Sequence, residues 1–332
     1  MSPMRTFDGS DVDYGAVMNI HNTLFPEWFD TVESMKASDA SRDPKRMLER
    51  VLWEEDEKPV AYATFGESTW SYRPGKYFIS IRVLPDWQRR GIGTALYDHV
   101  VDVLSKRDPE PAILTSDARE DMEHCVRFLT SRGYERVQRQ EVSMLDVGKF
   151  DFDAFASRRG AVERAGLEVV TGVELAERYE DWRRKLYDLD WEILQDVPVP
   201  DRLTRQPLER WVKEELEHPA FLPEGWFLAM DGDEPASLSS VWTALGDPKR
   251  LYQGLTGTRR PYRRKGLATD LKIRVIEFAR DRGVDSILTD NEENNPMYGI
   301  NVALGYRKMP AWLSMRKKLK ELPPDDETEP AV

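Results

Sequence analysis

Hydrophobic and polar residues alternate in two stretches of the first half of the chain, and this alternation predicts β-strands. The stretches are VAYATFG at 60–66 and YFISIRV at 77–83, and both hold the β-branched and aromatic residues that strands favour. Downstream, residues 92–104 (IGTALYDHVVDVL) place apolar side chains at helical spacing. Three more elements are predicted further on: a short buried strand, a helix and a closing strand, at 113–115, 120–131 and 141–145.

The second half of the chain repeats this plan. A strand is expected to begin near Leu167, at LEVV. The elements that follow are strands at 226–230, 238–242 and 251–256, a helix at 266–280, a strand at 286–289, a helix at 296–304 and a strand at 312–315. Strands in runs with helices between them predict an α/β (α+β) fold in which helices cover the faces of a sheet.

Two glycine markers recur in both halves. The first is WQRRGIGTAL, with Gly91, and its copy YRRKGLATDL, with Gly266, lies about 175 positions later. The second is SRGYERV, with Gly133, and ALGYRKM, with Gly305, about 172 positions apart. A shared order and near-equal spacing indicate a duplication into two domains rather than a solenoid of short repeats. We expect domains at 1–148 and 166–320, a helical linker at 149–165 and a disordered acidic tail (ELPPDDETEPAV) at 321–332.

Composition narrows the function classes. The chain has 332 residues, a hydrophobic fraction of 40% and a formal net charge of -12, which suits two globular domains and argues against binding to nucleic acid. Its single cysteine, Cys125, excludes an intrachain disulfide and a cysteine-based zinc site. The sequence has no long apolar run and no charged, then apolar leader. We therefore expect a cytoplasmic protein that acts without a metal, a membrane or a nucleic acid.

Both basic-glycine segments stand where a strand is expected to end and a helix to begin. The N-terminus of a helix leaves about four backbone N–H groups unpaired and carries about half a positive charge, so it suits a phosphate group. Two common phosphate motifs do not fit: neither segment contains Gly-Lys-Ser/Thr, and the third glycine of a dinucleotide fingerprint is replaced by Leu96 or Leu271. Both segments instead fit Gln/Arg-x-x-Gly-x-Gly/Ala, at 88–93 and 263–268.

This pattern resembles the acyl-CoA pyrophosphate loop of the GCN5-related N-acetyltransferase (GNAT) superfamily, and the later Gly-Tyr marker is similar to that family too. The resemblance covers nearly the whole chain twice, as in the tandem group to which mycothiol synthase belongs. It implies two tandem GNAT-type domains, each a mixed, mostly antiparallel twisted sheet flanked by helices, with acetyl-CoA (coenzyme A) as cosubstrate. The residues that it implies for the cofactor are Val83, Gln88, Arg89, Arg90, Gly91, Ile92, Gly93 and Thr94 in the first half, and Leu255, Thr256, Gly257, Thr258, Arg263, Arg264, Lys265, Gly266, Leu267, Ala268, Thr269, Asn291 and Asn294 in the second.

The resemblance also implies a catalytic pattern on a later helix. Many family members carry there an Asn that orders the acyl-CoA arm and, seven positions on, a Tyr that protonates the leaving thiolate. The second half has Asn294 and Asn301 at these positions, so Asn301 becomes a catalytic candidate. Tyr298 is a second candidate, although one residue position on a helix turns a side chain by about 100°. Because the first half has Met122 and Leu129 there, we expect the C-terminal domain to carry the chemistry and the N-terminal domain to bind acyl-CoA or to be a structural relic.

The implied reaction is direct transfer of an acetyl group to the primary amine of a small molecule or protein. A backbone N–H near 255–258 would polarise the thioester carbonyl, and a base or a water chain would deprotonate the amine. Glu67 is a candidate base, or else a solvated strand end. The segment 182–211 contains Asp196 and is rich in Trp, Asp and Glu. It is a candidate region for a cationic acceptor, or else a set of core aromatics and solvated acids.

Other functions stay open at this stage. A non-catalytic acyl-CoA-binding or regulatory protein with degenerate GNAT domains would explain the missing tyrosines. A mycothiol-synthase-like enzyme would need a glycosyl-cysteine amine, which no residue pattern selects. In each case we expect a monomer or a homodimer. Release of free thiol from acetyl-CoA with a panel of amines separates an enzyme from a binding protein.

Overall fold

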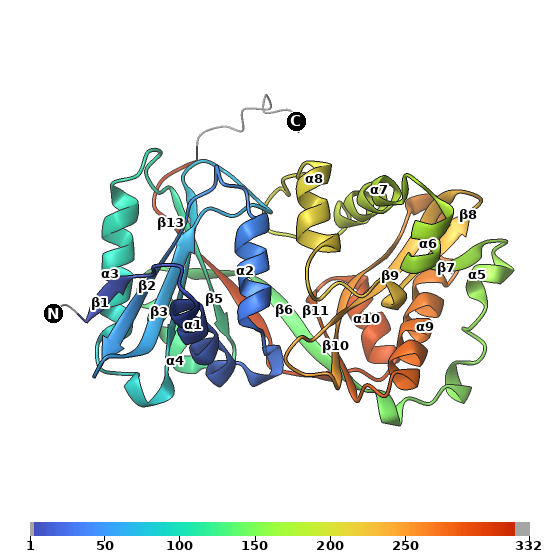
Figure 1. Cartoon of the computed structure of the whole chain (residues 1–332), viewed down its shortest axis with the longest axis horizontal. Helices are drawn as coiled ribbons and strands as arrows, with labels where there is room; N and C mark the ends of the chain where they lie inside the picture. The colour runs from blue at the N-terminus through green and yellow to red at the C-terminus, as the bar shows by residue number, and fades with distance from the viewer. Residues whose placement is uncertain (1–2, 323–332) are drawn as a thin grey trace. The chain divides into compact units, whose positions relative to one another are not determined.

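The computed structural model describes residues 3–322 as two compact units (Figure 1). Unit 1 contains the described residues up to Arg139, together with Pro200–Arg210 and the chain from Trp312 on; unit 2 contains Gln140–Val199 and Trp211–Ala311. Neither unit is continuous in sequence, in contrast to the predicted domains at 1–148 and 166–320. Of the predicted tail at 321–332, all but the first two residues lie outside the described part of the chain.

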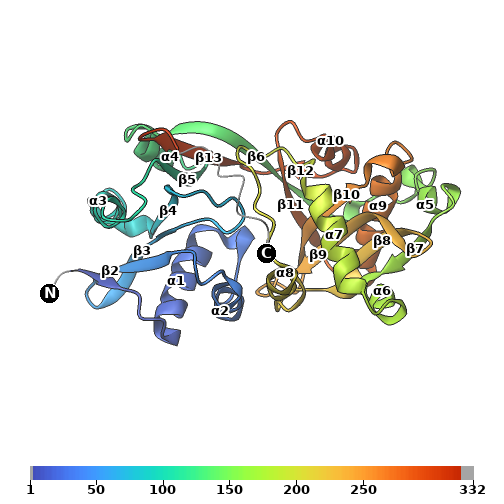
Figure 2. The same cartoon turned by 90° about the horizontal axis from the view of Figure 1, so that it is seen from above.

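Unit 1 is built on a mixed, mostly antiparallel sheet. Its strands follow the order β1, β2, β3, β4, β5, β13, and only β4 and β5 pair in parallel. The strands are β1 (Met4–Thr6), β2 (Leu48–Glu55), β3 (Lys58–Gly66), β4 (Lys76–Val83), β5 (Ile113–Arg119) and β13 (Trp312–Lys318). The helices α1 (Asp11–Leu24) and α2 (Val32–Ser41) lie on one side of the sheet, and α3 (Ile92–Ser105) and α4 (Glu123–Thr130) lie on the other (Figure 2).

Alternation along the strands explains this layering in unit 1. Leu52 and Tyr62 pack against α1, whereas their strand neighbours Val51 and Ala63 pack against α3. Successive residues of a strand point to opposite faces, so both faces of the sheet are apolar at β2 and β3, and both are covered there by helices. Leu96 of α3 is fully buried in the second of these cores, which stabilises the unit by roughly 1.5–3 kcal/mol.

Unit 2 repeats the architecture. Its strands follow the order β7, β8, β9, β10, β11, β6, with β10 and β11 parallel and β12 paired to β6. They are β6 (Glu135–Asp146, of which Gln140 onwards lies in unit 2), β7 (Glu168–Thr171), β8 (Trp226–Asp231), β9 (Glu234–Thr243), β10 (Arg250–Thr258), β11 (Ser286–Glu292) and β12 (Arg307–Lys308). The helices are α6 (Gly172–Arg178), α7 (Trp182–Leu194), α8 (Leu208–Trp211, of which only Trp211 lies in unit 2), a π-helix at Val212–Leu216, α9 (Leu267–Asp281) and α10 (Pro296–Ala303).

Each unit contains one strand that the sequence analysis assigned to the other domain. The predicted strand at 141–145 forms as part of β6, but it pairs with β11, where Leu145 lies opposite Ile287. The predicted strand at 312–315 forms as β13, but it pairs with β5, where Met315 lies opposite Ser116. The alternation of a strand specifies which face is buried and does not specify the neighbouring strand. The domain boundaries therefore differ from those inferred from the order of the elements.

The predicted helical linker at 149–165 forms only short helical turns, all within unit 2. They are the 3-10 turns η3 (Val147–Lys149) and η4 (Asp153–Phe155) and the four-residue helix α5 (Ala161–Arg164). Gly160 and Gly166 flank α5 with φ of +74° and +79°. This left-handed backbone does not continue a right-handed helix, so the segment breaks into pieces.

Both units open a wedge between their two parallel strands. β4 pairs with β5 only from Lys76 to Phe78, and β10 pairs with β11 only from Arg250 to Tyr252. In each case both strands continue beyond the last pair, so their far ends separate. The units differ on the other edge of this central strand. β10 carries a bulge against β9 between Gln253 and Thr256, whereas the register of β4 against β3 is continuous.

Candidate functional site

The two basic-glycine loops have the same backbone conformation. Arg89 and Arg264 both adopt positive φ, +62° and +63°, which is uncommon for residues with a side chain. Gly91 and Gly266 follow with φ of +88° and +81° and are the N-caps of α3 and α9. Glycine is needed here because an L-residue is strained at these φ values. The loops are thus structural copies, each ending a wedge strand and starting a helix.

The first side chain of each loop anchors it to the preceding strand. Gln88 donates from Nε2 to the carbonyl oxygen of Val83 at 2.9 Å. Arg263, at the same place in the second loop, donates from Nε to the carbonyl oxygen of Thr258 at 3.0 Å. Gln88 and Arg263 were predicted to bind the cofactor, and the structure gives both a role in shaping the loop.

A cavity of about 570 Å³ occupies the wedge of unit 1 and reaches the first loop. Six of the predicted cofactor residues line it: Val83, Gln88, Arg89, Gly91, Gly93 and Thr94. The other two do not, because Ile92 is buried in the core and Arg90 stacks over the ring of Trp87 at 4.6 Å. Opposite the loop, the cavity is bounded by β5, by α4 and by the turn that follows α4.

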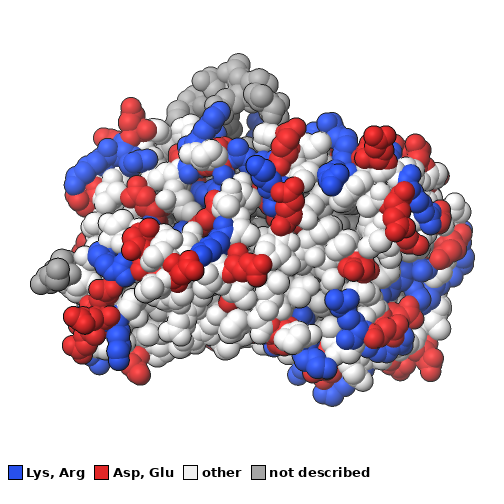
Figure 3. Space-filling view, in the orientation of Figure 1, with Lys and Arg blue, Asp and Glu red and all other residues white. Residues whose placement is uncertain are grey.

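Five arginines line the cavity although the chain is acidic: Arg82, Arg89, Arg119, Arg127 and Arg132. Three of them pair with carboxylates, Arg82 with Asp117, Arg119 with Glu27 and Asp121, and Arg127 with Glu123, whereas Arg89 and Arg132 make no ion pair within the described residues. On the face of the molecule seen in Figure 3, by contrast, acidic and basic side chains are interspersed. A concentration of arginines beside a helix N-terminus suits a ligand with several phosphate groups.

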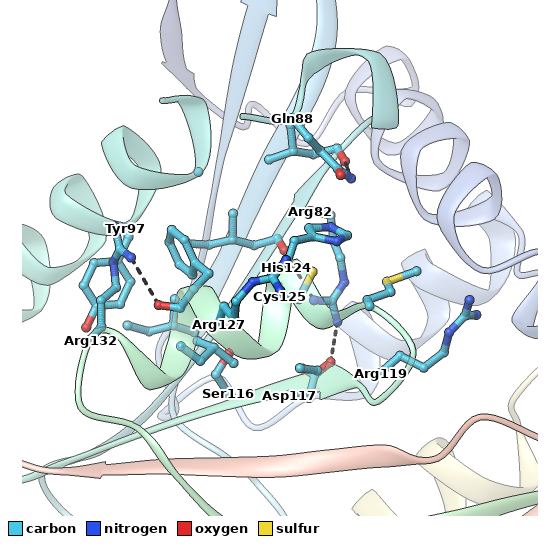
Figure 4. Close-up of a pocket in the computed structure, with 18 of the residues that line it drawn as sticks. Arg82, Gln88, Tyr97, Ser116, Asp117, Arg119, His124, Cys125, Arg127 and Arg132 are labelled. Carbon is cyan, nitrogen blue, oxygen red and sulfur yellow. Dashed lines mark hydrogen bonds and ion pairs between the residues drawn. The ribbon is translucent and has the colours of Figure 1, made fainter. Parts of the chain in front are cut away.

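Apart from Arg89, these arginines were not recognised in the sequence, because they come from separate segments. Arg132 lies over the ring of Phe128 at 3.7 Å and donates to the hydroxyl of Thr94 at 2.9 Å, which ties the end of α4 to the first turn of α3 (Figure 4). Its one sequence signal is that it directly precedes the Gly133 marker. Arg82 of β4 crosses the wedge to Asp117 of β5, with 2.5 Å between Nη2 and Oδ2.

Several protonated groups face the cavity where the expected catalytic tyrosine is missing. Leu129 and Met122, which hold the two family positions, both line it. Burial raises the pKa of the Cys125 thiol and of the Tyr134 phenol, so both stay protonated near neutral pH. The hydroxyls of Tyr97 and Tyr134 are buried and make no hydrogen bond to another described residue. Buried polar atoms normally have partners, so these hydroxyls are available to a ligand.

Glu67, the candidate base, has a structural role. It accepts a hydrogen bond from the backbone N–H of Met47 at 2.9 Å through Oε2, and it does not line the cavity in unit 1. The structure therefore agrees with the alternative that treated Glu67 as the end of a strand.

The catalytic candidates of the second half lie in unit 2. Asn301 is fully buried, and its Nδ2 donates to Oδ1 of Asn291 at 2.6 Å, which ties α10 to the end of β11. Asn294 lies in the turn before α10, not on the helix, because Asn295 caps the helix and Pro296 begins it. Its side chain donates to Glu292 at 2.8 Å. Tyr298 is half-buried on α10. Asn294, predicted to order the acyl-CoA arm, and Asn301, the catalytic candidate, thus both make contacts within unit 2.

The remaining residues predicted for the second cofactor loop are largely engaged with protein groups. Thr256 and Thr258 share hydrogen bonds with Ser239 and Ser237 of β9, at 3.0 and 2.8 Å. The carbonyl oxygens of Leu255 and Gly257 accept from Ser240 and Ser237. Leu267 is buried, Lys265 lies 5.5 Å from the ring of Tyr262, and Arg264, Ala268 and Thr269 complete the loop and the first turn of α9.

A buried lysine fills the position in unit 2 that a cavity tyrosine holds in unit 1. Lys272 and Tyr97 each lie six positions after the loop glycine. Lys272 is 1% exposed, donates from Nζ to Oε1 of Gln253 at 2.9 Å and lies 5.5 Å from the ring of Tyr306. Burial lowers the pKa of its ammonium group to about 7. Gln253 begins the β10 bulge, so protein side chains fill this part of the wedge.

Asp196 neutralises the second loop. It accepts hydrogen bonds from Arg260, at 2.8 Å, and from Arg263. The bond from Arg260 is the largest influence that lowers the pKa of this carboxyl group. Asp196 was a candidate for contact with the acceptor, but the structure places it against the cations that a phosphate would need.

Two of the aromatic residues in the predicted acceptor region 182–211, Tyr187 and Trp211, are buried in unit 2, whereas Trp182 and Trp191 are half-buried. Tyr187 and Trp211 meet edge to face at 5.6 Å, and the Trp211 indole donates to Asp190 at 3.2 Å. Burial raises the pKa of Asp190 to about 7. The pKa of Glu215, on the neighbouring π-helix, is raised to about 8 by burial and by the charge of Asp190. The alternative that called these aromatics core residues fits Tyr187 and Trp211.

Replacing Asp190 with asparagine should stabilise unit 2 above neutral pH. In the native protein the Asp190 carboxyl group stays protonated up to about pH 7, whereas in the unfolded chain it ionises near its usual pKa of 3.8. Its contribution to stability is therefore full below about pH 4 and is lost as the pH rises through 7. The amide removes this loss and still accepts from Trp211. We expect a gain of about 2–4 kcal/mol at pH 8 and little change at pH 4, measured by urea unfolding. Asp188→Asn, which breaks an exposed pair on the same helix, should leave the pH profile unchanged; the same response in both variants would contradict the assignment.

Within residues 3–322, no group of three or more His, Cys, Asp or Glu side chains is arranged to hold a metal ion. In the same part of the chain, every helix is too short or too polar to cross a membrane.

Comparison with known proteins identifies a family and several solved structures that this chain resembles. The model of the acetyltransferase (GNAT) family matches residues 15–139 and 183–300. The fold is similar to a tandem GNAT protein from the clavulanic acid biosynthesis pathway, solved without AcCoA, at 20% identity and a TM-score of 0.73, covering 95% of this chain and 98% of that one. It is also similar to a GCN5-related N-acetyltransferase from Sphaerobacter thermophilus, at 18% identity and a TM-score of 0.68, covering 97% and 98%. A search among curated proteins gives no match. Because the two matched regions span most of the sequence, the chain belongs to the GNAT family of acetyltransferases.

Proposed function

We propose that the protein is an N-acetyltransferase that moves the acetyl group of acetyl-CoA to a primary amine, and that the cavity of unit 1 binds the acetyl-CoA. The observation that carries this proposal is the arginine-lined cavity in the β4–β5 wedge. Its arginines and the N-terminus of α3 match the negative charge of the pyrophosphate and 3′-phosphate. The wedge beyond them would take the thioester arm.

The reaction is a direct transfer. The neutral amine nitrogen attacks the thioester carbon, the N–C bond forms, the C–S bond breaks, and the sulfur leaves as a thiolate. The proton lost by the amine goes to water, and the thiolate takes one from a protonated group. Cys125, whose pKa burial raises, is in place to supply it and to regain a proton from water. This chain thus offers a proton source although Leu129 occupies the tyrosine position.

The described residues favour unit 1 over the C-terminal domain that the Asn294 pattern indicated. In unit 2, Lys272 fills part of the wedge and Asp196 pairs with two arginines at the loop. An acyl-CoA would have to displace both. We therefore assign donor binding to unit 1.

Titration with acetyl-CoA and a free-thiol assay with an amine panel test this function. Arg132→Gln removes a cavity cation, and we expect it to weaken acetyl-CoA binding by about 10- to 100-fold, the effect of one charge-assisted contact. Arg136→Gln, an exposed residue in the next strand that does not line the cavity, should bind normally. Tight binding with no thiol release for any amine would favour the non-catalytic acyl-CoA-binding protein instead. No binding at all would refute the proposal.

A further inference from the structure

One face of the unit 1 sheet carries polar and charged residues where a core would be expected. In the β5–β13 pair, Asp117 lies opposite Ser314 and Thr115 lies opposite Arg316. These four side chains point to one face, because their neighbours Leu114 and Met315 belong to the core beside α3. Buried or half-buried polar groups on a sheet face need hydrogen-bond or ionic partners, which a bound molecule can supply.

A second cavity of about 350 Å³ is lined by these four residues and shares lining residues with the first, just beyond the last β4–β5 pair, Phe78 and Thr115. Ile79, Ser116 and Asp117 line both cavities. The other residues of the second cavity are Lys76, Phe78, Thr115, Val137, Pro200, Asp201, Ser314, Met315 and Arg316. A molecule in the second cavity would therefore reach the proposed donor through the gap where β4 and β5 separate.

The far end of the second cavity holds a positively charged cluster. Lys76 Nζ and Arg316 Nη2 both contact Oδ2 of Asp201, at 2.7 and 2.6 Å. Two cations on one carboxylate leave an excess positive charge. Lys76 is 5% exposed, and its Nζ also donates to Oγ of Ser71 at 2.9 Å, so protein groups hold this ammonium group. The buried Nε of Arg316, by contrast, has no hydrogen-bond partner in the described part of the chain. A buried, unpaired guanidinium N–H beside excess positive charge calls for an anionic group.

The near end of the second cavity offers a carboxylate. Asp117 contacts Arg82 through Oδ2 only, and its side chain is 40% exposed. Oδ1 therefore stays available to a cation at the junction with the donor cavity. Arg316 lies opposite Thr115, two residues from Asp117, so the negative and positive ends are about 7 Å apart along the strands.

The positive end is completed by the second half of the sequence. Asp201 lies in Pro200–Arg210, and Arg316 lies in β13. Backbone hydrogen bonds hold Thr204 beside Trp70, and Arg210 pairs with Asp43 at 3.0 Å. These contacts fix Asp201 in place. Because unit 1 is not continuous in sequence, Asp201 and Arg316 of the positively charged cluster come from segments far along the chain from β4 and β5.

We propose that the second cavity binds the acceptor, and that the acceptor is a small amine that also carries an acidic group, such as an amino acid or a short amino-acid conjugate. Its ammonium group lies at Asp117, beside the thioester, and its acidic group lies at Arg316, with the charge of Lys76 close behind it. The separation of these ends favours an acid several bonds away from the amine. This inference rests on the proposed function, since it takes acetyl-CoA to lie in the first cavity.

Acetylation of matched acids and amides tests the inference on the full-length protein. β-Alanine, 4-aminobutyrate, 5-aminopentanoate and a mixed set of α-amino acids would each be compared with the corresponding amide in the free-thiol assay. We expect the acids to be preferred about 10- to 100-fold in kcat/KM, since one charged contact gives a factor of this size. Arg316→Gln should remove this preference mainly through KM, whereas its acetyl-CoA binding should stay normal. Lys318→Gln changes the same face of the same strand outside the cavity and should keep the preference.

The outcomes separate this inference from the proposed function. Equal use of acids and amides by the wild type overturns the inference, and so does turnover confined to amines without an acidic group, although both leave the acetyltransferase assignment intact. Loss of acetyl-CoA binding in Arg316→Gln would place Arg316 in the donor site and also overturn it. Failure of the wild type to bind acetyl-CoA overturns the proposed function, and the inference with it.

Discussion

Replacing Gly91 with valine should abolish acetyl-CoA binding, whereas the same change at Gly266 should leave it unchanged. Gly91 has a φ of +88° and Gly266 a φ of +81°, and both are N-caps of helices that follow a basic loop. A β-branched residue is strongly disfavoured at such φ values, at a cost of at least 1–3 kcal/mol. A Cβ at Gly91 would meet nothing within 4 Å, so the strain acts through the backbone. The first loop would rearrange, move Arg89 and turn its N–H groups away from the ligand, and we expect affinity to fall at least 100-fold.

The pair of glycine variants is its own control. Both impose the same backbone strain on the same loop conformation, so a general loss of stability would affect both alike; circular dichroism and urea unfolding measure that loss. Calorimetric titration with acetyl-CoA then reports only the site. Loss of binding in Gly266→Val with normal binding in Gly91→Val would place the donor in unit 2, as the Asn294 pattern first indicated. Partial loss in both would show that both loops bind.

The local elements of this fold could be predicted because their signals are contiguous. The strands at 60–66 and 77–83 and the helix at 92–104 appear as β3, β4 and α3 with ends that differ by no more than two residues. The two loops were found for the same reason, since arginine, glycine and the following helix are adjacent in sequence. Their repetition indicated two domains, their resemblance to the GNAT family implied the fold, and the family match over two regions confirms it.

Features that depend on distant residues could not be predicted in the same way. The alternation in β6 and β13 revealed two strands, but their partners are set by register with β11 and β5. The arginines of the cavity come from three separate stretches, so Arg82 and Arg132 looked like ordinary surface charges. Asp201, about 125 residues from Lys76 in sequence, gave no signal before the fold brought the two together.

Lys272 is the most informative example of a position that the sequence analysis did not single out. In YRRKGLATDLKIRV it stands among other charged residues of an amphipathic helix, and a lysine there is usually solvated. The structure buries it beside Gln253. Its meaning emerges only from the comparison of the two units, because Tyr97 holds the same position at a cavity. In a duplicated fold, the two copies of one position can be compared directly. Tyr97 lines the cavity of unit 1, whereas the matching Lys272 is buried in unit 2.

Replacing Lys272 with methionine should abolish a rise in stability at alkaline pH. The pKa of the native ammonium group is about 7, against 10.5 for a free lysine, so between these values the unfolded chain holds a proton that the native protein lacks. Stability then increases with pH across this window, and the contribution of Lys272 is lost as the pH falls through 7. Between pH 8 and 10 the wild type should gain roughly 2–3 kcal/mol from this group, and the variant should gain none. Parallel urea titrations at several pH values measure the difference.

The same substitution tests whether unit 2 takes part in donor binding. Methionine has a volume similar to that of lysine, and it carries no titratable group. The variant leaves Oε1 of Gln253 without its donor, which should lower the free energy of unfolding by about 1–3 kcal/mol at every pH. Lys213→Met, at an exposed position of the π-helix, should leave the pH profile as it is. A parallel profile in Lys272→Met and the wild type would contradict the buried charge. If Lys272 only fills a wedge that binds no acyl-CoA, the variant should bind acetyl-CoA as tightly as the wild type, since the ligand lies in unit 1. A new, second equivalent of bound acetyl-CoA would instead mean that the lysine alone had kept the second wedge closed, and that the duplicated domain still holds the rest of a donor site.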